Sequence, residues 1–433
     1  MPKEIVANPA AVGANPEAGS NRGALSTVTT LFFMWGFLTC LNDILVPHLK
    51  SIFDLSYAEV MLIQFSFFSA YFIFSIPAGK LIDRIGYKRT MVAGLFTMGA
   101  GAMLFVPAAK APSFPLFLAA LMILATGITA LQVAANPYVT ALGPGSTASS
   151  RLNLTQAFNS LGTTAAPYFG SLFILSAAPK SVEEMRRMSA QALHAYRLHE
   201  AASVKLPYLG LSLALVLLGI FIAAMKLPAI PGAVKRGSGA VPDRGASVWR
   251  HRHLVLGAVG IFVYVGAEVA IGSFLVNYFG QPTIGNIPPN VAARFVSLYW
   301  GGAMVGRFIG SAVLQRVRTG TVLGAAAIAA GLLVVTSMLS AGPVAMWSII
   351  LVGFCNSVMF PSIFALGVAG LGPLTGDGSG VLVMAIVGGA IIPLVQGVLA
   401  DHIGIQHAFI LPVICYVYIF YYAVKGSQRV AVT

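Results

Sequence analysis

Two carboxylic acids lie deep inside apolar stretches, where an acid needs a chemical reason. Asp43 lies within LFFMWGFLTCLNDILVP, and Glu268 lies within YVGAEVAIGS. A charged side chain at the centre of a membrane helix costs roughly 2.5–3.5 kcal/mol on insertion scales, so such residues usually face a protein interior or an aqueous path. We predict that both acids are ion-coupling residues, which release and take up a proton, or sense a cation, while a polar solute passes. The alternatives are a buried structural acid at either position and, for Glu268, direct hydrogen bonding to the solute.

Amide side chains accompany these acids in the apolar segments. An amide both donates and accepts hydrogen bonds, which suits the hydroxyl groups of a sugar. The predicted substrate-binding amides are Asn42, Gln132, Asn136, Gln156, Asn159, Asn356 and Gln396. The spacings of Gln132 to Asn136 and of Gln156 to Asn159 place each pair on one helix face. Any single amide is also suited to bracing neighbouring membrane helices. We add Phe360 and Trp300 as aromatic faces for a sugar ring, although most aromatic residues in membrane helices pack or face lipid.

The composition decides which elements hold these residues. The 433-residue chain is 57% hydrophobic and only 9% charged, whereas soluble proteins contain about 25% charged residues. It is therefore predicted to be an all-α polytopic membrane protein, with room for about 12 transmembrane helices of about 20 residues each. The apolar runs place these helices at 26–49, 57–82, 89–109, 113–141, 150–176, 204–227, 253–280, 289–315, 320–340, 343–370, 378–401 and 405–424.

The two halves of the chain read as copies. Asn136-Pro137 aligns with Phe360-Pro361, and nearly the same offset places Asp43 opposite Glu268. A parallel repeat of two pseudo-symmetric six-helix halves is the architecture of major facilitator transporters, whose substrate lies near the bilayer midplane. We divide the chain into a cytoplasmic N-terminal tail (1–25), a first half (26–227), a cytoplasmic linker (228–252), a second half (253–425) and a C-terminal tail (426–433).

The basic residues indicate an orientation. The net charge of +13 is spread over short loops, without the aromatic interleaving of a nucleic-acid interface, so no nucleic acid is expected as a partner. Lys and Arg gather on one side of the predicted spans, which places both termini in the cytoplasm. The three cysteines all lie in apolar runs, so neither a disulfide framework nor a metal cluster is expected, and we predict no cofactor.

The loop Gly79 to Arg89, GKLIDRIGYKR, resembles the major facilitator signature between the second and third spans. Its acid, Asp83, is suited to pairing with arginine or to capping a helix end. A degenerate second copy surrounds Arg316. The predicted gating residues are Asp83, Arg84, Arg89 and Arg316. We expect ion pairs across the halves to hold one facing state closed, with plain positive-inside anchoring as the alternative. Arg307, in GGAMVGRFIG, is expected to snorkel to the cytoplasmic face; a gate partner is its alternative role.

Longer matches identify a narrower branch. The segments LNDILVPHL, QVAANPYVTALGP, RLNLTQAFNSLG and FPSIFALG resemble the fucose/glucose-galactose permease (fucose:proton symporter) family of major facilitator sugar transporters. This resemblance implies proton coupling at Asp43 and a sugar cavity lined by Gln156 and Asn159. One position departs from the fucose symporter, which has a second coupling carboxylate where this chain has Gln132, an amide that does not titrate.

These observations favour a proton-coupled symporter that imports a hexose of the glucose or galactose type, or N-acetylglucosamine or fucose, by alternating access. The sequence lacks a Walker-type loop, so an ion gradient is expected to supply the energy. Sodium coupling and a non-transporting sugar sensor stay open as alternatives. A membrane enzyme is disfavoured because the histidines lack metal-binding spacing. The expected partners are sugar, proton or sodium, and membrane lipid, for a monomer in a bacterial inner membrane.

Overall fold

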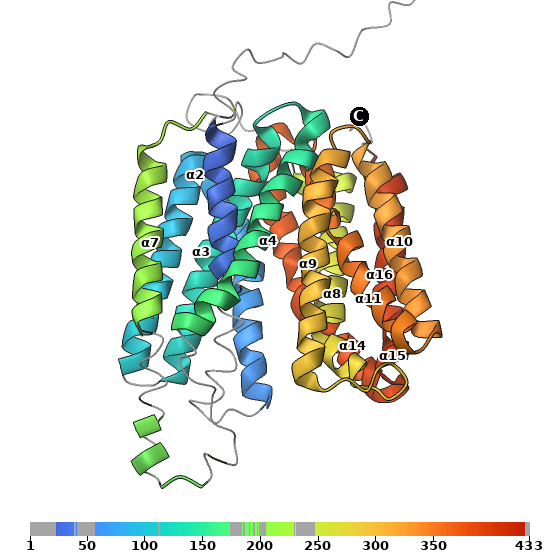
Figure 1. The fold of residues 1–433 in the computed structure, drawn as a ribbon. Helices are drawn as coiled ribbons and strands as arrows, with labels where there is room; N and C mark the ends of the chain where they lie inside the picture. The colour runs from blue at the N-terminus through green and yellow to red at the C-terminus, as the bar shows by residue number, and fades with distance from the viewer. Residues whose placement is uncertain are drawn as a thin grey trace, which may run out of the picture.

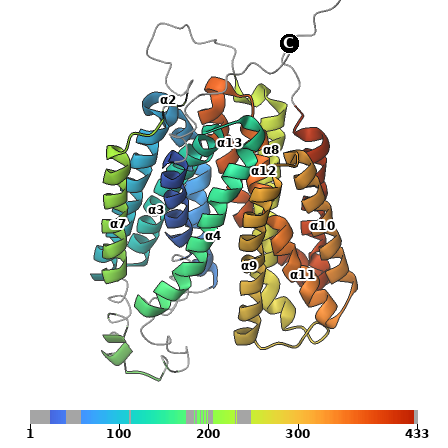
Figure 2. The same ribbon diagram turned by 45° about the horizontal axis from the view of Figure 1, so that its top comes forward.

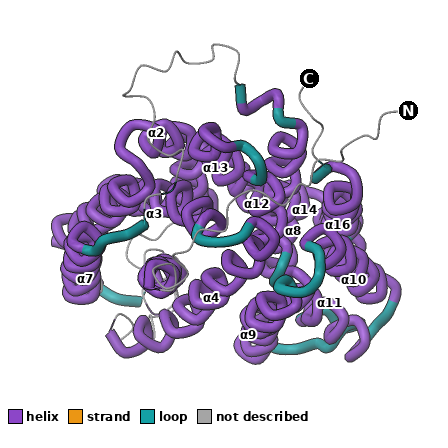
Figure 3. Tube along the Cα trace, turned by 90° about the horizontal axis from the view of Figure 1, so that it is seen from above, coloured by secondary structure: helices purple, strands orange, loops and turns teal. Residues whose placement is uncertain are grey.

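The computed structural model consists of helices and the turns between them. It describes residues 23–38, 40, 57–110, 113–173, 184, 187–189, 191–193, 195–196, 198, 205–228, 230 and 247–428. Within these ranges no strand is assigned (Figure 3). Asn42 and Asp43 lie outside the described residues, as do most of the predicted N-terminal tail and most of the predicted linker.

The first half is built from long apolar helices. In chain order they are Gly23–Leu38, α2 (Tyr57–Lys110), α3 (Phe114–Ala141), α4 (Ala148–Phe173) and α7 (Lys205–Ala224), with the short turn η1 (Gly145–Thr147) before α4. Helix α2 contains two predicted spans, because Gly86 interrupts it with φ 81° and ψ 167°. Glycine adopts this conformation without the steric cost that a side chain would add.

The second half repeats this plan with more breaks. Its elements are η2 (Val248–Arg250), α8 (Arg252–Phe279), α9 (Pro289–Val313), α10 (Thr319–Leu339), α11 (Gly342–Asn356), α12 (Met359–Val368), η3 (Gly372–Leu374), α13 (Thr375–Met384), η4 (Ala385–Val387), α14 (Gly388–Ile403), α15 (Ile405–Ala408), α16 (Ile410–Tyr421) and η5 (Tyr422–Gly426). Helices α11 and α12 form one span, η3 to α14 form the next, and α15 to η5 form the last.

The helices account for the predicted spans in their predicted order. Eight described helices are long and apolar enough to cross a membrane, and one of them, Phe65–Lys110, continues across Gly86 into a second predicted span. Gly23–Leu38 is apolar but shorter. Helices α4 and α9 are 26 and 25 residues long, and they carry more polar side chains because each lies where the halves meet. The all-α fold of about 12 spans is confirmed.

The helices form two bundles that stand side by side (Figures 1 and 2). Helices α2, α3, α4 and α7 belong to the first bundle, and α8 to α16 belong to the second. Helix α4 lies beside α9 at the junction, where Ser150 Oγ donates to the Ser311 carbonyl oxygen at 2.6 Å and Ser149 lies 2.9 Å from Thr319 between hydroxyl oxygens. The first described helix begins at the same end of the molecule as the C-terminus (Figure 1).

Helix α13 makes the second contact between the bundles. Ser379 Oγ donates to the Val133 carbonyl oxygen of α3 at 2.7 Å. On the α2 side, a Cβ atom added to Gly380 would lie 2.8 Å from the Ser75 carbonyl oxygen. The backbones approach this closely because glycine has no side chain. These contacts, like those of α4 with α9, gather toward the end of the molecule that carries the termini.

Gly353→Ala is expected to destabilise the second half. A Cβ atom there would lie 2.1 Å from the Tyr299 carbonyl oxygen, so α11 and α9 would have to separate. Overpacking of this kind costs about 1–3 kcal/mol, which thermal unfolding of the purified protein in detergent would detect. The matched control is Gly301→Ala, where a Cβ atom meets nothing within 4 Å. Equal melting temperatures for the two variants would contradict the close approach.

Candidate functional site

Glu268 lies in the middle of α8, and tyrosine hydroxyls hydrogen-bond to its carboxylate and to its backbone oxygen. The residue is 9% exposed. Tyr264, one helical turn earlier, donates from its hydroxyl to Glu268 Oε1 at 2.8 Å, and the Tyr299 hydroxyl of α9 donates to the Glu268 backbone oxygen at 3.2 Å. A buried acid needs such partners because leaving its oxygens unpaired is costly. The arrangement fixes one carboxylate at a known place in the second half.

Asn356, at the end of α11, ties these tyrosines together. Its Nδ2 donates to the Tyr299 hydroxyl at 2.9 Å, and its Oδ1 accepts from the Tyr416 hydroxyl at 2.8 Å. Its backbone oxygen lies 3.1 Å from the donating hydroxyl of Tyr264. The side chain is fully buried. Asn356 therefore braces α8, α9, α11 and α16 around Glu268, and its predicted contact with sugar stays a prediction.

Arg307 connects this acid to the other half. Its Nη2 lies 3.9 Å from Glu268 Oε1, with the arginine side chain 14% exposed. Its Nη1 donates to Ser160 Oγ of α4. The expectation that Arg307 snorkels to the cytoplasmic face is wrong, because a buried carboxylate and a hydroxyl from the opposing helix draw the guanidinium into the junction.

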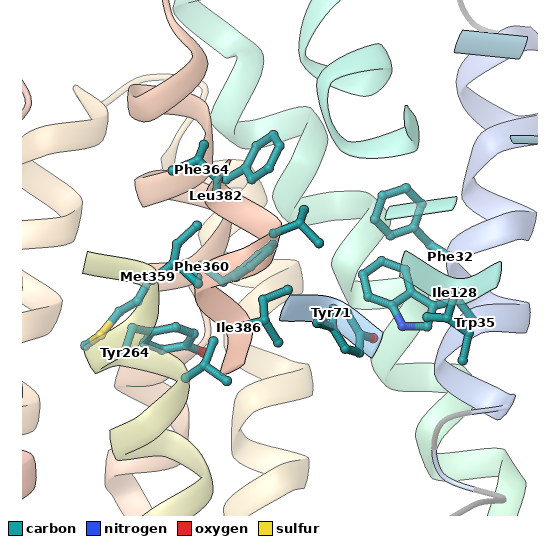
Figure 4. Packing of buried hydrophobic residues seen from close by; sticks show 14 of the residues in the cluster. Phe32, Trp35, Tyr71, Ile128, Tyr264, Met359, Phe360, Phe364, Leu382 and Ile386 are labelled. Atoms are coloured by element: carbon teal, nitrogen blue, oxygen red, sulfur yellow. The ribbon is translucent and has the colours of Figure 1, made fainter. Parts of the chain in front are cut away.

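The predicted amides of the first half lie on α3 and α4. Gln132 Nε2 donates to the Tyr71 hydroxyl of α2 at 2.7 Å, while its Oε1 is buried without a hydrogen-bond partner. Asn136, one turn further along α3, is buried with both amide atoms unpartnered. Figure 4 shows Tyr71 between Trp35 of its own half and Ile386 of the other. This part of the junction therefore holds polar atoms with unused hydrogen-bonding capacity.

Helix α4 presents the second predicted pair. Asn159 Nδ2 donates to the Phe32 carbonyl oxygen at 3.0 Å, which ties α4 to the first helix. Gln156 is buried and its Nε2 has no partner. Of this i, i+3 pair, Asn159 braces two helices and Gln156 keeps a free donor.

The remaining predicted binding residues lie in the second half. Phe360, on α12, is buried and stacks on Phe364 with ring centroids 6.0 Å apart (Figure 4). Trp300 is 43% exposed and its ring lies against Gly272 of α8. Gln396, on α14, is fully buried with both amide atoms unpartnered. Their contact with a sugar stays a prediction.

The predicted gating residues differ in their surroundings. Asp83 Oδ1 lies close to the first turn of α13, since a Cβ atom on Gly376 would be 3.1 Å from it. A carboxylate is favoured there by the positive end of the helix dipole. Arg84, Arg89 and Arg316 are exposed. Among the described residues no group of three or more metal-ligating acid, His or Cys side chains is present.

Comparison of the sequence with protein-family models identifies the family. The model described as Major Facilitator Superfamily matches residues 26–386. The chain belongs to the major facilitator superfamily.

Relatives narrow the position within the superfamily. The chain is 53% identical over 406 residues to a protein named glucose/galactose transporter from Brucella abortus (strain 2308), covering 94% of each chain. It is 37% identical over 426 residues to the L-fucose-proton symporter of Escherichia coli (strain K12), covering 95% of each. The crystal structure of FucP in the outward conformation matches with a TM-score of 0.87 and 35% identity, over 94% of this chain and 100% of that one. The resemblance to the fucose/glucose-galactose permease family is thus confirmed.

Sequence reasoning considered Tyr264 and Tyr299 only as aromatic faces for a sugar ring and did not predict that tyrosines would hydrogen-bond around Glu268. Tyr264 carried a usable signal, because it precedes Glu268 by four residues and so shares its helix face. Tyr299 and Tyr416 reach the site from other spans. No spacing rule links residues that meet only through the packing of several helices.

Asn356→Leu is expected to lower stability, because the Tyr416 hydroxyl loses its acceptor and the Tyr299 hydroxyl loses a donor while keeping the Glu268 backbone oxygen. A buried group left unpaired costs about 1–3 kcal/mol. The measurement is the thermal unfolding temperature in detergent, with Asn277→Leu, an exposed position on α8, as the matched control. If both variants melt together, the amide does not organise the tyrosines.

Proposed function

We propose that this protein is a proton-coupled symporter that carries a hexose of the glucose or galactose type by alternating access between its two halves. The observation that carries the proposal is the set of buried amide atoms without partners on α3 and α4, from Gln132, Asn136 and Gln156. Unpaired buried donors and acceptors are costly. Sugar hydroxyls both donate and accept, so a hexose satisfies them when the halves move apart. The names of the relatives support the same substrate class.

The acids supply the coupling in this proposal. Glu268 is held by Tyr264 inside the second half, and Asp43 is its counterpart in the sequence repeat of the first half. A proton binds, the sugar binds, the halves rock about the midplane, and both leave on the other side. The amide at Gln132, where the fucose symporter has a carboxylate, is proposed to favour a glucose-type substrate over fucose.

We also propose an orientation and a facing state. The positive-inside rule places both termini and the linker 228–252 in the cytoplasm of a bacterial inner-membrane protein. The contacts of α4 with α9 and of α13 with α2 then close the cytoplasmic side. Similarity to the outward conformation of FucP supports an outward-facing state.

Uptake into proteoliposomes tests the proposed function. An imposed gradient, acidic outside, is expected to drive labelled glucose or galactose above its external concentration, and a protonophore is expected to abolish this. Accumulation that requires a sodium gradient would refute proton coupling. Binding without accumulation would indicate a sensor.

Asp43→Asn serves as the coupling variant in the same assay. An amide cannot carry the proton, so uphill uptake is expected to fall to the level of protein-free liposomes while sugar-for-sugar exchange persists. Normal accumulation by this variant would remove Asp43 from the mechanism.

Gln132→Glu tests the choice of sugar. A hydrogen bond to a charged group contributes about 1.5–3 kcal/mol, so the preference between glucose and fucose is expected to shift roughly ten- to hundredfold toward fucose. The measurement is competition against labelled hexose by glucose, galactose, fucose, mannose and N-acetylglucosamine. The control is Gln428→Glu, at an exposed position near the C-terminus. An unchanged profile would separate Gln132 from substrate selection.

A further inference from the structure

Arg307 joins the two halves in the middle of the contact between α4 and α9. Its guanidinium lies 3.9 Å from the Glu268 carboxylate within its own half and donates to Ser160 Oγ of the other half. Its backbone oxygen accepts a hydrogen bond of 2.6 Å from Asn153 Nδ2 of α4. Its Nε is buried without a partner. One side chain therefore touches both the acid of the second half and the facing helix of the first.

Helices α4 and α9 approach each other closely around Arg307. A Cβ atom added to Gly310, one turn further along α9, would lie 2.8 Å from Asn153 Nδ2. The Phe158 and Phe308 rings lie 6.0 Å apart across the same contact. Ser150 and Ser311, which meet toward the terminal end, are both buried. The guanidinium is mostly buried in this contact, with 14% of the arginine side chain exposed, and separation of α4 and α9 would expose it further.

The charge of Arg307 is permanent, whereas the charge of Glu268 is not. A guanidinium does not lose its proton in proteins. When Glu268 is ionised, the two charges compensate each other inside the closed contact. When Glu268 is protonated, the arginine stays charged with its counter-charge gone, and an uncompensated buried charge is strongly destabilising. Separation of the halves then lets water reach the guanidinium.

We propose that Arg307 is a positioning residue that converts the charge state of Glu268 into closure or separation of the α4–α9 contact. The ionised acid holds this end closed through Arg307, and protonation of the acid releases it. The inference rests on the proposed symport function, in which it assigns the step that links proton binding to the movement of the halves.

The other groups that face Glu268 do not provide this switch. Tyr264 on α8, Tyr299 on α9 and, through Asn356, Tyr416 on α16 present hydroxyls, which ordinarily titrate near pH 10. Helix α14 presents Ile392 against the neighbouring Gly266. Among these described neighbours Glu268 is the carboxylic acid that can bind or release a proton, and Arg307 is the cation beside it.

A buried reporter tests the proposal without relying on transport or on membrane orientation. The native cysteines, Cys40, Cys355 and Cys415, are replaced by alanine, and Ser150→Cys is introduced at the buried α4–α9 contact. Alkylation of this thiol is measured in detergent, where the reagent reaches both ends, and each rate is divided by that of the same protein after unfolding at the same pH. This normalisation removes the effect of pH on thiol reactivity.

The expected result is a double-mutant cycle with rescue. Glu268→Gln, which mimics the protonated acid, is expected to raise the alkylation rate at least about tenfold, because it leaves Arg307 uncompensated. The Glu268→Gln/Arg307→Gln double variant is expected to return to within about twofold of the reference, since no charge remains. A merely structural role for Arg307 predicts further opening in the double variant instead.

The pH profile supplies the second readout. The alkylation rate of the reporter is expected to rise as falling pH protonates Glu268. The Arg307→Lys variant is expected to show the same pH dependence, and the Arg307→Gln variant is expected to show none. Equal rates for all variants, or a double variant as open as Glu268→Gln, would overturn the proposal. If the wild type accumulates hexose while the reporters react alike, the switch is wrong and symport stands. If the reporters respond but no proton-driven uptake occurs, the proposed function fails on its own.

Discussion

The Arg307 guanidinium, which stays protonated, lies between two helical bundles and constrains the structure around it. Arg307 is tolerable in the junction only while a carboxylate stands nearby, because the desolvation of an unpaired charge would exceed what its remaining hydrogen bonds return. Glu268 must therefore be held in place, and Tyr264, Tyr299 and Asn356 do so from three helices. The dense polar network of the second half follows from the need to fix one acid.

The contacts that close the terminal end are of a different kind. Ser150 with Ser311 and Ser379 with Val133 are hydroxyl-to-backbone hydrogen bonds, each of which contributes only about 0.5–1.5 kcal/mol net. Glycines at the α13 contact let the backbones approach without interlocking side chains. A surface joined by weak bonds and smooth backbone can part and re-form. An interface of interdigitated large side chains would resist the rocking that alternating access requires.

The sequence predicted the spans, the repeat and the faces of the helices, because hydrophobic length and i, i+4 spacing are local properties. Gln132 and Asn136 do share one face of α3, as the spacing predicts. The expectation for Arg307 failed for an instructive reason. The snorkelling prediction treats α9 as a single helix between lipid and water. In the structure, Arg307 of α9 instead meets the Glu268 carboxylate and Ser160 from other helices. The contact of Tyr416 with Asn356 has no sequence signature, since it joins side chains from the separate spans α16 and α11.

The offset that aligns Asn136-Pro137 with Phe360-Pro361 also pairs Gln132 with Asn356, yet the structure gives these two amides unequal surroundings. The amide nitrogen and oxygen of Asn356 both hydrogen-bond to tyrosines. In Gln132, Nε2 donates to Tyr71 and Oε1 has no partner. An amide with both polar atoms hydrogen-bonded is held in one position, whereas an amide with a free polar atom can bind a hydroxyl group. The two repeat-related halves of the fold thus differ in what their equivalent amides do. The second half holds a charge in a fixed place, and the first half, together with Gln396 of α14, keeps the unused hydrogen-bonding capacity that a polyhydroxylated solute requires. Coupling between solute and ion must then cross the junction, and Arg307 is the described side chain that touches both sides of it beside the acid.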